Sequence, residues 1–322
     1  MLTFIVRRAL WTVLVMFVIT VIVFFIFFKT PGVDPARAIA GRNSNPQILA
    51  EIRAQFGLNR PLWVQYAEMM KSLFVTRNLV SYSDQGVLVV PEIGAAAPAT
   101  LSLVFGAALI WVIVSIAMGV AAALLRGTVL DPLLMIIALI GFSTPPFWAG
   151  TVANLITQGG LHNTFLFSWV PPLGYTPLTS NPLHWFEGLV LPWITLSILY
   201  IGFYARVLRA SVLEVQNEDY VRTARAKGAS ERRVLWVHIF RNSLVAIVTL
   251  LGLSLPTLVA GAIFIEVVFN YPGMGLAFYN AALNVDYQVL LGFTLIATLA
   301  TIVGNLLADV GYALLDPRVR YN

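Results

Sequence analysis

Six long apolar segments constrain this chain more than any other feature. They cover residues 9–28, 98–125, 130–157, 188–208, 243–268 and 288–315. A helix needs about 20 apolar residues to cross roughly 30 Å of hydrocarbon, and each segment meets that length. The composition agrees, because the chain is 59% hydrophobic and only 11% charged. The segments therefore predict an all-α membrane protein with six transmembrane helices.

The basic residues predict the orientation of these spans. With the N-terminus inside, thirteen of the twenty Lys and Arg residues fall in short cytoplasmic segments. The other seven lie in the long 29–97 segment, on which the rule has little force. Both termini should therefore be cytoplasmic. The first segment is too long for the apolar core of a signal peptide, so we expect a retained helix.

The 29–97 segment carries its own helix signals. Asn45-Pro46 is typical of an N-cap followed by proline at the first helical position. Apolar residues then repeat at helical spacing up to Gly57, and Pro61 opens a second candidate helix. So short a segment buries little core by itself. We expect a small external helical cap, which divides the chain into 1–28, 29–97 and a membrane core over 98–322.

Several kinds of chemistry are absent from the sequence. The chain has no cysteine, which excludes thiolate catalysis and cysteine-ligated metals. None of its three lysines follows a glycine, which excludes a P-loop for phosphate binding. The three histidines are scattered, and none lies inside a predicted span as a general base. We therefore expect no enzyme, no metal and no cofactor in this chain, and no nucleic-acid partner.

Few polar residues lie inside the spans, where they mark functional or packing sites. Asn305 and Asp309 are spaced to share one face of the last helix, and Glu266 lies at the outer end of the fifth. Pro145-Pro146 should break or kink the third helix. A row of small residues, Ser115, Gly119 and Ala123, is typical of helix packing. A structural role in packing is open for each of these positions.

The charge is concentrated instead in residues 218–233, where eight of sixteen side chains are charged. An inert loop would not need the small and apolar residues between the charges. A helix bound to lipid would separate basic from apolar faces, whereas acidic residues are mixed in here. A nucleotide site lacks its glycine-rich loop. A helix that docks on another protein fits best, with Ala224 as the expected closest contact and Gly228 where the chain leaves the helix.

The stretch Asp219-Tyr220-Val221-Arg222-Thr223-Ala224-Arg225-Ala226-Lys227-Gly228, followed by His238 and Arg241-Asn242, resembles the coupling loop of dipeptide/oligopeptide-type permeases of ATP-binding-cassette importers. Other stretches are similar to the same family: Arg7-Arg8, Gly57 to Pro61, Ser143 to Phe147, Glu266 to Phe269, Pro272 to Gly275, and Asp309 to Arg318. The chain departs from it at Val75 to Leu79, where the family usually has a Gly-Asp-x-Gly-type turn.

The resemblance implies a type I importer permease fold and alternating access driven by ATP. The implied partners are a homologous second permease, two cytoplasmic ATPase subunits that hold ATP and Mg, and an extracytoplasmic solute-binding protein that delivers a peptide. Within the coupling loop, 211–240, the ATPase contacts would be Asp219, Tyr220, Arg222, Thr223, Ala224, Arg225, Ala226, Lys227 and Gly228.

We also expect a gate at the outer face. It would consist of Glu266 and a rigid turn at Pro272, Gly273 and Gly275, whose glycines permit positive φ. A membrane-edge Glu266 that simply faces water is the alternative. Nickel, glutathione and oligosaccharides are alternative cargoes within the family, and a secondary transporter is the competing class. The resemblance places the chain in a bacterial or archaeal inner membrane.

Overall fold

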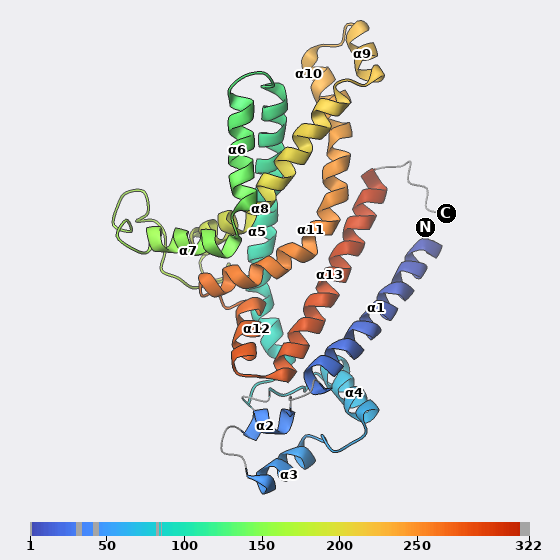
Figure 1. Ribbon diagram of the computed structural model, residues 1–322, viewed down its shortest axis with the longest axis vertical. Helices are drawn as coiled ribbons and strands as arrows, with labels where there is room; N and C mark the ends of the chain where they lie inside the picture. The colour runs from blue at the N-terminus through green and yellow to red at the C-terminus, as the bar shows by residue number, and fades with distance from the viewer. Residues whose placement is uncertain (1, 30–33, 41–44, 82–83, 85, 316–322) are drawn as a thin grey trace. The chain divides into compact units, whose positions relative to one another are not determined.

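The computed structural model describes residues 2–29, 34–40, 45–81, 84 and 86–315, and most of them are helical (Figure 1). Within that described part the chain forms no strand beyond one isolated antiparallel bridge between Val80 and Leu88. The all-α prediction is therefore confirmed for these residues.

The chain divides into two compact units. Of the described residues, unit 1 joins those between 2 and 98 to 272–303, and unit 2 contains 99–271 and 304–315. The first 98 residues thus pack with a segment that the sequence analysis assigned to the core. Unit 1 holds α1 (Leu2–Lys29), α2 (Pro35–Ala40), α3 (Pro46–Gln55), α4 (Leu62–Met70), η1 (Lys71–Val75), α12 (Met274–Leu283) and most of α13 (Tyr287–Leu315).

Unit 2 contains the charged loop and the helices beside it. Its members are α6 (Leu130–Ser143), α7 (Pro146–Thr157), α8 (Pro182–Val215), α9 (Asp219–Ala226), α10 (Glu231–Arg233), η2 (Val234–Phe240) and α11 (Arg241–Val268). The boundary between the units falls inside α5 (Val89–Leu124). Within unit 2, α9 and α10 lie at one end and α7 lies towards the other (Figure 1).

All six predicted apolar segments coincide with helices. Three described helices have the length and hydropathy of a membrane span: Val89–Leu124, Pro182–Val215 and Tyr287–Gly304. Among the described residues, the bent pair α6 and α7, whose axes differ by 99°, could form a fourth span. The described apolar parts of α1 and α11, Leu10–Ile26 and Thr257–Val268, are shorter. The structure therefore supports three or four spans, and six stays a prediction.

The predicted break at Pro145-Pro146 is confirmed and is sharper than a kink. Thr144 and Pro145 both adopt extended backbone, as residues before a proline tend to do, and α7 begins with Pro146. The segment 130–157 is therefore not one straight helix. With 14 residues, α6 alone reaches about 21 Å.

The helix signals of the 29–97 segment are also confirmed. The side chain of Asn45 accepts a hydrogen bond from the Ile48 amide at 2.8 Å, as an N-cap should. The turn between α3 and α4 is held by Gln65, whose Nε2 donates to the carbonyl oxygens of Leu58 and Arg60. The hydroxyl of Tyr66 in α4 lies 2.6 Å from that of Thr20 in α1. Helix α4 therefore packs on α1 within unit 1.

Two turns of unit 1 place ordinary residues in the left-handed region. Arg77 has φ 54° within the stretch that departs from the family pattern. Val285 has φ 57° at the end of α12, where its amide and that of Asp286 bond back to Ala282 and Ala281. This is the Schellman arrangement, which normally places glycine at that position. A β-branched residue is a strong outlier there.

We therefore expect Val285→Gly to stabilise the protein. The left-handed conformation costs an L-residue about 1–2 kcal/mol, and the half-exposed Val285 side chain has little packing to lose. A thermal melt of the purified protein measures the change. Ala282→Gly, in the last turn of the same helix, is the matched control and should destabilise by about 1 kcal/mol. A lower melting temperature for Val285→Gly would contradict the prediction.

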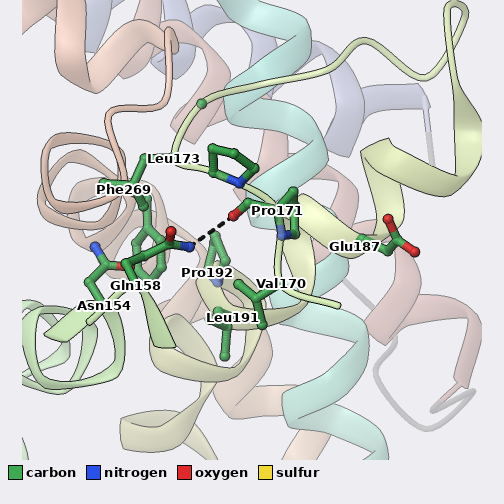
Figure 2. Close-up of a pocket in the computed structure, with 12 residues that line it drawn as sticks. Asn154, Gln158, Val170, Pro171, Leu173, Glu187, Leu191, Pro192 and Phe269 are labelled. Atoms are coloured by element: carbon green, nitrogen blue, oxygen red, sulfur yellow. Dashed lines mark hydrogen bonds between the residues drawn. The ribbon is translucent and has the colours of Figure 1, made fainter. Parts of the chain in front are cut away.

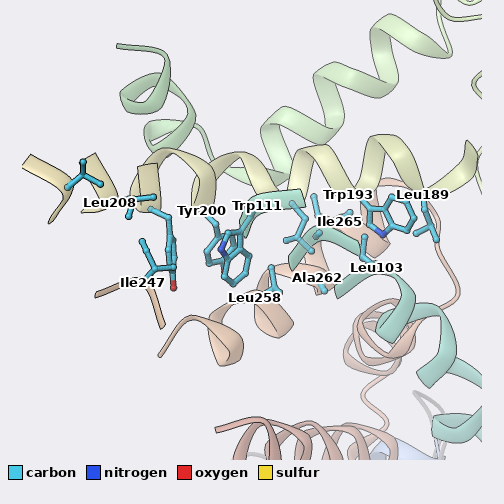
Figure 3. Packing of buried hydrophobic residues seen from close by; sticks show 14 of the residues in the cluster. Leu103, Trp111, Leu189, Trp193, Tyr200, Leu208, Ile247, Leu258, Ala262 and Ile265 are labelled. Carbon is cyan, nitrogen blue, oxygen red and sulfur yellow. The ribbon is translucent and has the colours of Figure 1, made fainter. Parts of the chain in front are cut away.

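Small residues bring the helices of unit 2 into backbone contact. Ser115, Gly119 and Ala123 are all buried, which confirms the predicted packing row. A Cβ on Gly119 would lie 2.8 Å from the carbonyl oxygen of Ala205 in α8. Nearer the N-terminus of α5, Trp111 stacks on Tyr200 of α8 with ring centroids 4.6 Å apart, in the core shown in Figure 3. Helices α5 and α8 are therefore closely packed against each other.

Candidate functional site

The charged stretch forms a short helix at the end of unit 2. Three residues separate α9 from the end of α8, and α9 has Asp219 in its first turn and Arg225 in its last. Both charges suit the helix dipole. Val221 is fully buried and belongs to one apolar cluster with Val212 of α8 and Ile239 of η2. One face of α9 is therefore anchored on the unit.

The remaining faces of α9 are exposed, as a docking helix requires. The exposed candidate contacts are Asp219, Tyr220, Arg222, Thr223, Arg225, Ala226, Lys227 and Gly228. Their ion pairs are local: Arg222 lies 3.5 Å from Asp219, and Arg225 lies 2.9 Å from Glu231. Exposed pairs of this kind contribute about 0–1 kcal/mol, so they leave the charges available to a partner.

The structure places Ala224 differently from the expectation. Ala224 is half-buried and packs against the same cluster as Val221, one helical turn away. Its small size fits α9 onto its own unit, so it does not offer the most open surface. Ala226 is exposed and carries the smallest side chain on the outer faces of α9. A close approach by another protein is therefore expected at Ala226.

Gly228 ends α9 as predicted. Its φ is +80°, its amide donates to the Arg225 carbonyl at 2.9 Å, and the Ala229 amide donates to the Ala224 carbonyl at 3.2 Å. These bonds are those of a Schellman motif with glycine at C′. No atom lies within 4 Å of the place where a Cβ would stand. The glycine is therefore required by its backbone angle rather than by lack of space.

Glu266, the acidic candidate for the gate, does not face water. Glu266 in α11 is fully buried, and its Oε1 accepts a hydrogen bond of 2.6 Å from the Thr100 hydroxyl of α5. The alternative of a water-facing carboxylate is therefore wrong. Tyr271, also buried, donates its amide to the Glu266 carbonyl at 2.8 Å. This bond closes the C-terminus of α11.

The turn after α11 gets its positive φ from another residue than expected. Asn270 has φ 51°, whereas Gly273 is extended at φ −98° and precedes α12. Gly275 lies buried inside α12, and Pro272 is exposed. The glycines therefore do not supply the reversal, and asparagine does, since it tolerates the left-handed region better than most residues.

The two polar candidates of the last span lie partly outside the description. Asn305 and Asp309 fall in α13, but their side chains are not among those that the structure describes. Their packing role stays a prediction.

A small cavity of 20 Å³ lies between α7, α8 and the loop that joins them (Figure 2). Gln158 closes one side by donating Nε2 to the Pro171 carbonyl at 2.8 Å. Asn154 donates Nδ2 to the Val268 carbonyl of α11 at 2.9 Å, while its Oδ1 is buried with no protein partner. A cavity of this size holds about one water molecule. It is therefore not a substrate site.

The sequence analysis missed three contacts that matter for the site. Thr100 pairs with Glu266, Asp131 pairs with Arg209, and Gly202 lets α8 approach α6. Each joins residues more than sixty positions apart. Only the polarity of Asp131 and Thr100 near the ends of apolar helices could have signalled them. No three His, Asp or Glu side chains gather as a metal site within the described chain.

Comparisons with known proteins cover the whole chain. Residues 115–321 match the family described as binding-protein-dependent transport system inner membrane component. Residues 1–104 match the N-terminal region described for the membrane components of such transport systems. The fold of a crystallised amino acid ABC transporter with histidines covers 71% of this chain and 95% of its own, at TM-score 0.44 and 16% identity.

Three relatives align over nearly their full length. A Brucella abortus (strain 2308) protein that bears the name of a peptide transport system permease is 37% identical, covering 99% of each chain. The oligopeptide transport system permease protein AppB of Bacillus subtilis (strain 168) is 33% identical, covering 100% of each. The dipeptide transport system permease protein DppB of Alkalihalophilus pseudofirmus is 32% identical, also over 100% of each.

Proposed function

The chain belongs to the family of binding-protein-dependent transport system inner membrane components, and we propose that it is the permease subunit of a peptide importer. The observation that carries the proposal is full-length similarity to proteins named as peptide, oligopeptide and dipeptide permeases. The exposed helix α9 at the end of α8 agrees with it, because a permease without a nucleotide site needs a surface through which ATP hydrolysis elsewhere can act.

In the proposed complex, ATP and Mg are held by two cytoplasmic ATPase subunits, and α9 docks on one of them. ATP-driven closure of the ATPases moves α9 as a rigid body, and the pathway between this chain and a second permease opens outward. A solute-binding protein then delivers the peptide. The proposal includes six spans in a type I importer fold, cytoplasmic termini and an external 29–97 segment.

Reconstitution tests this function. The chain, expressed with its neighbouring genes and purified by a tag, is expected to bring a second permease and ATPase subunits with it. In proteoliposomes, the peptide-loaded binding protein should stimulate ATP hydrolysis. A chain that purifies alone and moves its substrate in response to an ion gradient would instead be a secondary transporter.

The proposed topology gives a labelling pattern. Because the chain contains no cysteine, single cysteines report cleanly on sidedness. We expect Asn59→Cys to react with a membrane-impermeant maleimide in intact cells, and Ser230→Cys to react only after the membrane is opened. Both positions are exposed on this chain, and a permeant maleimide that labels both is the control for their reactivity. The opposite pattern would invert the orientation.

The proposed gate predicts that the carboxyl group of Glu266 is needed for transport and that its shape alone is not enough. Glu266→Gln keeps the side-chain volume and an oxygen that can accept the Thr100 hydroxyl. We expect the complex to assemble normally, with peptide uptake and stimulated ATP hydrolysis reduced severalfold, since an amide cannot reproduce both oxygens of the carboxyl group that joins α11 to α5 through Thr100. Thr100→Ser, which keeps the hydroxyl, is the control. Wild-type uptake by Glu266→Gln would remove Glu266 from the gate.

A further inference from the structure

An ion pair joins α6 to α8 near the end of unit 2 that bears α9. Arg209 donates Nε to Oδ1 and Nη2 to Oδ2 of Asp131, both at 2.6 Å. Only 10% of the Asp131 side chain and 26% of the Arg209 side chain are exposed. Two parallel charge-assisted hydrogen bonds fix both direction and distance, which a single contact does not. The pair is therefore a stiff link between the two helices.

The same two helices touch at their backbones farther along. A Cβ on Gly202 of α8 would lie 2.1 Å from the Ala138 carbonyl of α6, and one on Gly141 of α6 would lie 3.2 Å from the Ile198 carbonyl. The contacts run antiparallel from Ile198 to Arg209, about 16 Å along α8. Because the two helices are in contact at both ends of this stretch, a movement of α8 should carry α6 with it.

Helix α8 is in turn tied to α9. Val212, one turn beyond Arg209, lies in the apolar cluster with Val221 of α9 and Val234 of η2. Only residues 216–218 separate the two helices. A displacement of α9 would therefore be transmitted to α8 close to the ion pair between Asp131 and Arg209.

The C-terminal end of α6 is connected, through α7, to the part of α11 that holds Glu266. After the break at Pro145, α7 is held against α11 by the hydrogen bond from Asn154 to the Val268 carbonyl. Gly150 of α7 also faces Val268 and Phe269, which would lie 3.2 and 3.1 Å from a Cβ at that position. Val268 follows Glu266 by two residues. A continuous chain of contacts thus runs from α9 through α8, α6 and α7 to the Glu266 end of α11.

We propose that Asp131 and Arg209 are positioning residues that make α6 move with α8, so that displacement of α9 reaches the α7–α11 end. The proposal rests on the function proposed above, which makes α9 the contact with the ATPase. Without the pair, the backbone contacts at Gly202 and Gly141 still hold α6 to α8, but the end of α6 near α9 follows α8 less closely. ATP hydrolysis then continues with less peptide imported.

The test is the number of peptides imported per ATP hydrolysed in proteoliposomes with loaded binding protein. We expect Asp131→Asn to lower this ratio about tenfold, within the usual range of coupling between sites. Arg209→Lys keeps the charge but loses the fork, and should give an intermediate ratio. Exchanging the partners in Asp131→Arg with Arg209→Asp should restore much of the wild-type ratio. Arg53→Lys, which alters the ion pair of Arg53 with Asp34 in unit 1, is the control and should leave the ratio unchanged.

An unchanged ratio in Asp131→Asn and Arg209→Lys would overturn the proposal. So would variants that melt at lower temperature yet import the wild-type number of peptides per ATP, because the pair would then only support folding. If Asp131→Asn does not assemble, the ratio in Arg209→Lys decides. Failure of the wild-type complex to respond to loaded binding protein would instead refute the proposed function, whatever the variants do.

Discussion

Ala226→Trp is expected to abolish peptide uptake while the permease still inserts and accumulates normally. Ala226 is exposed on the outer side of α9, and its own unit makes no demand on its size. A docking groove fitted to a methyl group cannot close on an indole, and a gap of even 0.5–1 Å forfeits a quarter to a half of the packing attraction. ATPase subunits should be lost during purification, and stimulation by loaded binding protein should disappear.

Two further variants separate docking from the shape of α9 itself. Gly228→Val forces a β-branched residue into φ +80° and should also abolish stimulation, because the Schellman bonds that end the helix are broken. Gly228→Asn should retain much of the activity, since asparagine tolerates this conformation. Ser230→Trp, exposed beyond the turn, is the matched control for bulk. Full stimulation by Ala226→Trp, with its ATPase partners retained, would end the assignment of α9 as the coupling helix.

Gly202→Ala is expected to have the largest effect on stability. The added methyl group would stand 2.1 Å from the carbonyl oxygen of Ala138 and 2.7 Å from the backbone nitrogen of Phe142. Neither atom can turn away as a side chain can, so α6 and α8 must separate along their shared stretch. Overpacking usually costs about 1–3 kcal/mol, and backbone contacts of this kind belong at or above the upper end.

Gly188→Ala is the control within the same helix. There the nearest atom to an added Cβ is a side-chain carbon of Pro171 at 3.8 Å, an ordinary contact. Alanine is also the better helix former, by about 1 kcal/mol. We therefore expect Gly188→Ala to melt at or above the wild-type temperature and Gly202→Ala to yield little folded protein. Equal melting of the two variants in detergent would show that α6 and α8 are not in backbone contact.

The sequence predicted the local features of the fold well because their causes are local. The cap at Asn45, the break at Pro145 and the helix end at Gly228 each follow from the geometry of one residue type and its immediate neighbours. The apolar segments predicted where helices lie, since hydropathy needs only composition over a window. The exposed charged helix followed from the same contrast in composition.

Features that depend on distant partners were missed or misassigned. Contact of Ala224 with a partner protein stays a prediction, but the sequence did not show that Ala224 also packs against the cluster of Val212 and Ile239. The sequence alone allowed Glu266 to face water, whereas the structure places the Thr100 hydroxyl against it. The left-handed residue at the turn before α12 was expected at a glycine, and the structure assigns it to Asn270. Helical spacing shows that a residue lies on a face, but not which neighbour covers that face.

The abrupt end of α6 has a consequence for the lipid around the protein. A helix of 14 residues reaches about 21 Å, which is short of the roughly 30 Å of hydrocarbon in a typical bilayer. Because α7 turns away by 99°, it adds little to this reach. Bilayers thin around short spans at a cost of fractions of a kcal/mol per Å. The length of the lipid acyl chains therefore affects the free energy of placing the α6–α7 corner in the bilayer. Shorter-chain lipids should favour the transport state in which this corner lies deepest in the bilayer.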